Sequence, residues 1–327
     1  MSRWLVPLLT LILIVLAGAS LLAGTVWLSP GEVLAAMADP HPSLTRLIVT
    51  EVRLPRLVLG VMVGGILGLS GAVLQGLLRN PLAEPGLLGV SSGASLGAVI
   101  AIYYGFSAAF SLATPLFALA GAGATVAVAL TLSRTGGTLS LILAGVAVSA
   151  IAGAGVSLAL NLAPSPFAAY EIMTWLMGSL ADRSWDHVVL AAPFVVLGAL
   201  LLLFTRRALD ALALGERQAE SLGIDVQRTR LLALVGTALG VGAAAAVTGA
   251  VGFVGLVAPH LVRPLVGHRP GATLVPAAIA GAVVVIAADL ATRLIPSGPD
   301  IKLGVFISAV GAPFFLWLVV HVRKSAP

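Results

Sequence analysis

The sequence of 327 residues contains no cysteine and only two lysines, and charged residues make up 9% of it. The absence of cysteine excludes disulfide bonds, thiolate metal sites and cysteine nucleophiles. A P-loop needs a lysine directly after its glycine-rich turn, and neither Lys302 nor Lys324 stands in such a motif. The chain therefore has no P-loop with which to hydrolyse ATP itself.

The scarcity of charge also excludes an ordinary soluble domain, in which about 25% of residues are charged. Hydrophobic residues make up 59% of the chain, and the mean hydropathy is +1.09. A soluble protein of this length would need more polar surface, because charged side chains are almost never buried without partners. The composition instead suits a lipid bilayer. We predict one all-α integral membrane domain over residues 1–327.

Ten apolar runs are candidates for membrane-spanning helices, each of which needs roughly 20 apolar residues. The stretch 231–267 is too long for one span, and Gly249 and Gly252 in its middle would permit a reversal, so it is divided. The first run is longer than the core of a signal peptide and is expected to remain as a helix. The predicted spans are 4–24, 57–77, 87–105, 112–132, 138–161, 188–205, 231–249, 253–266, 273–292 and 303–322.

The distribution of basic residues predicts the orientation of these spans. Ten spans place both termini on one side of the membrane, and that side holds twelve of the eighteen lysines and arginines. The same side holds only five of the thirteen acidic residues. Because cytoplasmic loops carry the excess of Lys and Arg, both termini are expected in the cytoplasm.

The sequence contains no recognisable motif for catalysis or for coupling transport to an ion gradient. The five histidines are scattered over both faces, without a His-Glu-x-x-His motif or paired carboxylates. Asp289 is the nearest candidate for a proton relay, but it precedes Arg293 by four residues, a spacing that favours a helical ion pair. A transporter is favoured over a membrane enzyme, and a secondary carrier or channel working without an ATPase remains the alternative.

Two arginines, Arg53 and Arg56, stand at the predicted outer mouth of the second span, where basic residues are disfavoured. Arg293 lies at the outer end of another span and could join them. Long cationic side chains often extend to lipid headgroups, which is one interpretation. The other is a dock for acidic residues of an external partner, since arginine forks suit carboxylates. Both interpretations remain open at this point.

Two outer segments, 28–56 and 162–187, lie between predicted spans. Residues 170–177 of the second are expected to form an interfacial helix, with Trp175 at headgroup level. On the cytoplasmic side, residues 79–86 contain two prolines and a glycine and predict a stiff, non-helical turn. The apolar Leu82 in this turn indicates that it folds back against the bundle.

The most polar part of the chain is the predicted cytoplasmic loop at about 206–230. Within it, residues 213–224 predict a short amphipathic helix ended by Gly223. Leu214, Ala219 and Leu222 are expected on one face of it. An exposed apolar helix face of this kind suits docking into a groove of a soluble partner.

Several motifs together resemble the FecCD-type permeases, the inner-membrane subunits of type II ABC importers for vitamin B12, haem and ferric siderophores. The resemblance covers essentially the whole length of the chain. It rests on Arg-Leu-Pro-Arg at 53–56 and on the segments 70–75, 80–89, 143–146, 252–260, 288–293 and 311–315.

This resemblance implies a multi-pass protein of the bacterial inner membrane with ten spans. It further implies a homodimer whose translocation path lies at the dimer axis, two ATP-binding-cassette ATPase subunits below and one substrate-binding protein above. The permease chain itself would bind no cofactor and no nucleic acid, and ATP and Mg²⁺ would bind to the ATPase. The cargo would be a metal chelate, with residues 23–31 and 83–85 leaning slightly toward the vitamin B12 permeases.

The resemblance also implies roles for particular residues. Arg53, Arg56 and Arg293 match the positions that receive glutamates of the binding protein. Asn80, Pro81 and Leu82 match a cytoplasmic gate, and Thr138 belongs to a second gate in which Gly137 replaces a serine of the vitamin B12 permease. The positions that match the ATPase-coupling helix are Leu214, Gly215, Glu216, Arg217, Ala219, Leu222 and Gly223.

One departure from the family pattern precedes the last span. Where the family usually has Glu-Leu-Pro-Ile-Gly-Val, this chain has Asp-Ile-Lys-Leu-Gly-Val at 300–305. Lys302 replaces a proline that would organise the first helical turn. It also adds a positive charge near the three outer arginines, so the acidic pattern of the partner is expected to differ.

Overall fold

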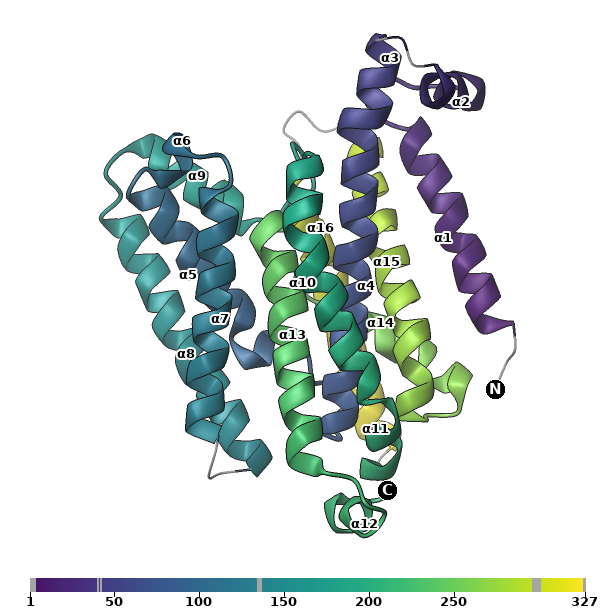
Figure 1. The fold of residues 1–327 in the computed structure, drawn as a ribbon, viewed down its shortest axis with the longest axis vertical. Coiled ribbons are helices and arrows are strands. Elements are labelled where there is room, and N and C mark those ends of the chain that lie inside the picture. Colours follow the sequence, from purple (N-terminus) through teal and green to yellow (C-terminus); the bar gives the residue numbers. More distant parts are fainter. Residues whose placement is uncertain (1–3, 40, 42, 134–136, 296–300, 326–327) are drawn as a thin grey trace.

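The computed structural model describes residues 4–39, 41, 43–133, 137–295 and 301–325, and the regular structure in this part is helical. Long helices form a bundle with short helices at both ends (Figure 1). Ten helices overlap in sequence with the ten predicted spans, while the number of membrane crossings stays a prediction. They are α1 Leu5–Leu22, α4 Leu54–Leu77, α5 Val90–Tyr103, α7 Ala113–Ser133, α8 Gly137–Asn161, α10 Trp185–Phe204, α13 Val226–Thr248, α14 Val254–Val262, α15 Pro270–Leu294 and α16 Leu303–Ser325.

Seven segments within the described residues are long and apolar enough to cross a membrane, and α5 and residues 303–316 are shorter apolar helices. The predicted division of 231–267 is confirmed, because α13 ends at Thr248 and α14 starts at Val254. Gly249 follows α13 with φ of +74°, a conformation that a residue with a Cβ rarely adopts. The chain can therefore reverse where the sequence predicts it.

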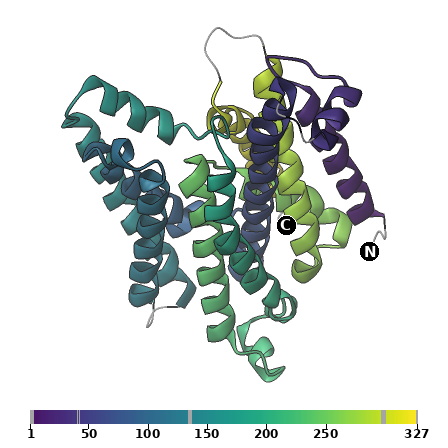
Figure 2. The same cartoon turned by 45° about the horizontal axis from the view of Figure 1, so that its top comes forward.

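The two ends of the bundle carry different short helices. At one end lie α2 Pro30–Ala38, α3 Leu44–Leu47, α6 Phe106–Ala109 and α9 Pro166–Leu176 (Figure 1). At the other end lie α11 Arg206–Leu212 and α12 Glu216–Ser221, together with the first and last described parts of the chain. Figure 2 shows the group from α5 to α9 beside the bundle that is built on α4, α13 and α15.

The helix that contains α4 starts earlier than the sequence predicts. Residues 44–77 form one continuous apolar helix, in which Ile48–Arg53 has π-helical geometry. Pro55 cannot donate a backbone hydrogen bond to the preceding turn, which favours a local π-bulge. The Trp185 indole N–H instead donates to the Thr50 carbonyl oxygen at 2.8 Å. The bulge thus lets the helix continue outward past the predicted start at residue 57.

The predicted helix around residues 170–177 is present as part of α9, whereas the depth of Trp175 at headgroup level stays a prediction. Trp175 is half-buried and packs against two hydrophobic clusters of the bundle. The exposed aromatic rings of α9 belong to Phe167 and Tyr170. Ile172 on the inner side of α9 is fully buried, so the helix presents Trp175 to its neighbours along the same side.

Candidate functional site

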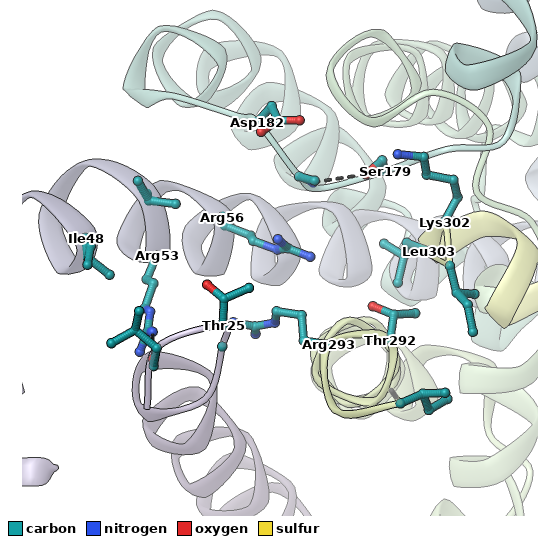
Figure 3. Close-up of a pocket in the computed structure, with 16 residues that line it drawn as sticks. Thr25, Ile48, Arg53, Arg56, Ser179, Asp182, Thr292, Arg293, Lys302 and Leu303 are labelled. Atoms are coloured by element: carbon teal, nitrogen blue, oxygen red, sulfur yellow. Dashed lines mark hydrogen bonds between the residues drawn. The ribbon is translucent and has the colours of Figure 1, made fainter. Parts of the chain in front are cut away.

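The three predicted docking arginines lie together at the N-terminal end of α4 and the C-terminal end of α15. Arg53, Arg56 and Arg293 line a cavity of about 530 Å³ (Figure 3). The segment after α1 forms part of its wall through residues 24–26, and Lys302 lines the opposite side. Residues far apart in the sequence thus form one basic site.

Asp289 is the anionic centre of this site. Its carboxylate accepts hydrogen bonds from Arg56 Nε at 2.9 Å and Arg56 Nη2 at 2.8 Å. Arg293 Nη2 lies 2.9 Å from its other oxygen, so the predicted ion pair across one helical turn is confirmed. Asp289 is only 1% exposed. The two arginines satisfy a buried charge that would otherwise be costly.

The same arginines hold the end of α1. Arg293 Nη1 donates to the carbonyl oxygens of Ser20 and Ala23, both at 3.0 Å. Arg53 donates to the carbonyl oxygens of Leu21, at 2.5 Å, and Val26. The last carbonyls of a helix lack partners within the helix, and cations are favourable beside them. Arg53 is consequently 6% exposed and does not extend freely toward lipid headgroups.

The charges of the cavity do not balance. Among the residues that the structure describes, three arginines and Lys302 line it, whereas Asp182 at its wall and Asp289 behind Arg56 are the acidic groups present. An excess of positive charge in a concave site attracts an acidic group of a partner. Arg56 remains the most accessible of the three arginines, with a side chain that is 20% exposed. Docking itself stays a prediction.

The turn after α4 has the stiff geometry that the sequence predicts. The Asn80 Oδ1 accepts the Leu82 N–H at 2.9 Å, and Arg79 adopts a φ of +49°. Ala83 and Pro85 are buried, so the turn does fold back against the bundle, although Leu82 itself is only half-buried. The gate role of Asn80, Pro81 and Leu82 remains a prediction. Thr138 lies in α8, and its side chain is outside the described ones.

Glu84 is a residue of this turn that the sequence analysis did not single out. Burial raises the pKa of its carboxyl, while a hydrogen bond from the backbone N–H of Phe253 opposes that rise. Phe253 precedes α14 with a φ of +62°, and an added methyl group at Gly311 of α16 would lie 2.6 Å from its Cβ. Glu84 therefore links the turn to Phe253, which directly precedes α14 and lies against Gly311 of α16. The available signal was that it is the single acid between Glu51 and Glu171.

The predicted coupling segment contains α12 and the turns that flank it. Leu214 and Leu222 are each 64% exposed, and Arg217 is exposed between them. Ala219 is fully buried, so the expectation that it shares a face with the two leucines is wrong. The helix spans only six residues, too few for a periodic pattern to define its faces.

Contacts with the rest of the chain fix the coupling segment in place. Gly215 and Gly223, at the two ends of α12, have φ of +115° and +82°. The Ile224 N–H donates to the Ala219 carbonyl oxygen at 3.0 Å, which ends α12. Glu216 lies 3.5 Å from Arg230 of α13. The two exposed leucines, Leu214 and Leu222, therefore lie on a segment that its contacts with the rest of the chain keep in a fixed conformation.

Comparisons with known proteins agree over nearly the whole chain. The sequence model of the FecCD transport family matches residues 10–321. The vitamin B12 import system permease protein BtuC of Salmonella paratyphi A is 38% identical over 326 residues, which is 99% of this chain and 96% of that protein. The hemin transport system permease protein HmuU of Yersinia pestis is 37% identical over 280 residues, 84% of each chain.

A solved structure shows the same likeness in three dimensions. It is a metal-chelate type ABC transporter in an inward-facing conformation, and it matches with a TM-score of 0.86 at 32% sequence identity. The match covers 97% of this chain and 98% of that one.

Proposed function

Because the chain belongs to the FecCD transport family, we propose that it is the permease subunit of an ATP-binding-cassette importer. Its cargo is a metal chelate: an iron–siderophore complex, haem or cobalamin. The observation that carries this proposal is near full-length agreement, in sequence and in fold, with permeases and a transporter of this kind. The bacterial inner membrane is the location that the bacterial relatives support.

The proposed topology has ten spans and cytoplasmic termini. Ten helices that correspond to the predicted spans support it. The described parts of both termini lie toward the end of the bundle that carries α11 and α12, which supports an even number of crossings (Figure 1). The excess of basic residues on that side supports its cytoplasmic assignment.

The working importer would be a homodimer of this chain with two ATPase subunits and one substrate-binding protein. ATP and Mg²⁺ would bind to the ATPase, because this sequence has no P-loop. The binding protein would place acidic side chains at Arg53, Arg56 and Arg293. The excess of positive charge in their cavity supports this role. The turn of Asn80, Pro81 and Leu82, with Thr138, would close the path on the cytoplasmic side.

Transport in proteoliposomes tests the proposed function. The permease is reconstituted with a partner ATPase and binding protein, sought among the products of neighbouring genes, and uptake of cobalamin, haemin and ferric siderophores is measured. Uptake of one chelate is expected only with ATP and all three proteins present. A catalytically inactive ATPase variant is the control. Uptake by the permease alone would instead support the alternative of a carrier or channel and would overturn the importer assignment.

The exposed leucines of the coupling segment give a second prediction. Leu214→Asp combined with Leu222→Asp is expected to weaken ATPase binding more than tenfold, because burying each leucine contributes about 1.5–3 kcal/mol. Binding is measured by pull-down of the ATPase with the purified permease. Leu44→Asp is the matched control, since Leu44 is 76% exposed at the opposite end of the bundle. Unchanged ATPase affinity in the double variant would show that the coupling surface lies elsewhere.

A further inference from the structure

A second polar cavity, of about 370 Å³, lies next to the arginine cavity and beside α9. Ser179, Asp182 and Lys302 line both cavities, so the two adjoin at the same end of the bundle. None of the described residues predicted to dock the binding protein, form the gate or couple to the ATPase lines the second cavity. Its lining is rich in hydroxyl groups, those of Ser107, Ser111, Thr114, Tyr170, Thr174 and Ser179.

Arg183 is the unusual residue of this cavity. Its Nε is shielded from solvent and has no hydrogen-bond partner. Within the described part of the chain, none of its nitrogens makes a hydrogen bond or an ion pair. A shielded donor without a partner costs free energy, although the Arg183 side chain as a whole is only half-buried. Burial accordingly lowers the pKa of the guanidinium, against the attraction of Asp182. Arg183 therefore contributes no hydrogen bond or ion pair to the described part of the fold.

Among the described residues, the other charged and titratable groups that line the cavity are Tyr170, Glu171, Asp182, His187 and Lys302. Asp182 and Glu171 are exposed, whereas Arg183 lies deeper. With His187 neutral, the two acids balance Arg183 and Lys302. This arrangement disfavours a polyanion, because the exposed acids would repel it. A group with a single negative charge can pass the two exposed acids and pair with the Arg183 guanidinium.

Hydroxyl donors are also available in the cavity. The side chains of Ser107, Ser111 and Thr114 make no hydrogen bond within the described residues, and all three come from the segment between α6 and the start of α7, a part of the chain far in sequence from Arg183. A carboxylate can accept a forked pair of hydrogen bonds from an arginine and further bonds from hydroxyl groups. The unused donors of the cavity therefore match the acceptors of a carboxylate.

We propose that this cavity is a carboxylate-binding site, with the guanidinium of Arg183 as its principal donor. Its position beside the arginine cavity gives the carboxylate two possible sources, an acidic side chain of the binding protein or the cargo itself. The choice of sources rests on the proposed function, whereas the site itself does not. A carboxylate bound here supplies the partner that Arg183 lacks within the described chain.

Stability of the isolated permease provides the first test. Arg183→Met removes the unpaired charge and keeps much of the apolar stem, so the apparent Tm in detergent is expected to stay the same or rise. Sodium acetate, compared with sodium chloride at equal ionic strength, is expected to raise the Tm of the native permease and not that of Arg183→Met. A lower Tm in Arg183→Met, or no acetate effect in the native protein, would overturn the proposal.

Binding to the partners identifies the source of the carboxylate. Affinity for the cargo-free binding protein and for each free chelate is measured with the native permease in nanodiscs and with Arg183→Met. A loss of about tenfold or more is expected in one of these two arms, since a charge-assisted hydrogen bond is removed. Arg183→Lys is expected to restore part of the lost affinity. The control Arg207→Met, at an exposed arginine of the opposite end of the bundle, is expected to change neither the affinity for the binding protein nor that for the chelates. Unchanged affinity in both arms would contradict the assignment.

Discussion

Asp289→Asn is expected to lower the free energy of unfolding by about 3–5 kcal/mol, the cost of breaking a buried ion pair from one side. The carboxylate is 1% exposed and lies 2.8 Å from Arg56 and 2.9 Å from Arg293. An asparagine has nearly the same shape but no charge, so the two guanidiniums would face each other across a neutral amide. The variant is also expected to loosen the packing of α1, because Arg293 donates hydrogen bonds to the carbonyl oxygens of Ser20 and Ala23 at the end of that helix.

Denaturation of the purified permease in detergent measures this effect. The matched control is Asp210→Asn, in a pair with Arg269 whose two side chains are 31% and 69% exposed. An asparagine at 210 can keep the hydrogen bond from the Gly271 N–H and loses only the exposed ion pair, worth about 0–1 kcal/mol. Adding Arg56→Gln to Asp289→Asn should recover part of the loss. Equal losses of unfolding free energy in the two asparagine variants would mean that the ion pairs of Asp289 contribute no more to stability than the exposed pair of Asp210.

The sequence predicts the helices of this protein well, because its apolar runs are long and bounded by charge or glycine. The position of Gly249 predicts the reversal between α13 and α14, and the spacing of Asp289 and Arg293 predicts their ion pair. Both features are local in the chain. The helix that contains α4 starts earlier than the sequence predicts, because the π-bulge before Pro55 lets it continue and the Trp185 indole N–H, far away in the sequence, donates to the Thr50 carbonyl oxygen.

Long-range contacts at the outer site could not be predicted in the same way. Arg56 and Asp289 are 233 positions apart, and no pattern along the chain pairs them. The carbonyl oxygens that Arg53 and Arg293 bind belong to the backbone at the end of α1, which carries no sequence signal. The sequence therefore located the arginines at one end of the bundle but left open whether they face lipid, a partner or the protein itself.

These contacts change what a docking partner would encounter. A partner carboxylate at Arg56 would compete with Asp289 for the guanidinium, while Arg53 and Arg293 also bind the end of α1. Docking at this cavity would thus change the hydrogen bonds that the arginines make with the end of α1 and with Asp289 of α15. For the same reason, charge reversal at Arg53 would disturb folding as well as docking, and so would charge reversal at Arg56, which pairs with the buried Asp289.

The close crossing of α4 and α14 leads to the last prediction, that Gly71→Ala prevents the native packing of these two helices. A methyl group at Gly71 would lie 1.8 Å from the carbonyl oxygen of Gly255. Both helices present backbone at this point, so no side chain can move aside. Restoring the 3.4 Å of ordinary contact requires a separation of roughly 1.6 Å, which would disturb the neighbouring turn because Pro85 also packs against Gly255. Overpacking of this kind typically costs about 1–3 kcal/mol or more.

Gly65→Ala is the control within the same helix, because the nearest atom to its added methyl group would be the Ala278 carbonyl oxygen at 3.8 Å. Alanine is favoured over glycine in a helix by about 1 kcal/mol, so Gly65→Ala is expected to keep or raise the Tm. Gly71→Ala gains the same helical propensity, and a lower Tm and lower yield of monodisperse protein would therefore report the contact alone. Equal behaviour of the two variants would show that α4 and α14 do not touch at Gly71. A loss confined to Gly71→Ala would establish the contact that positions α14, and with it Phe253, against Glu84 of the turn.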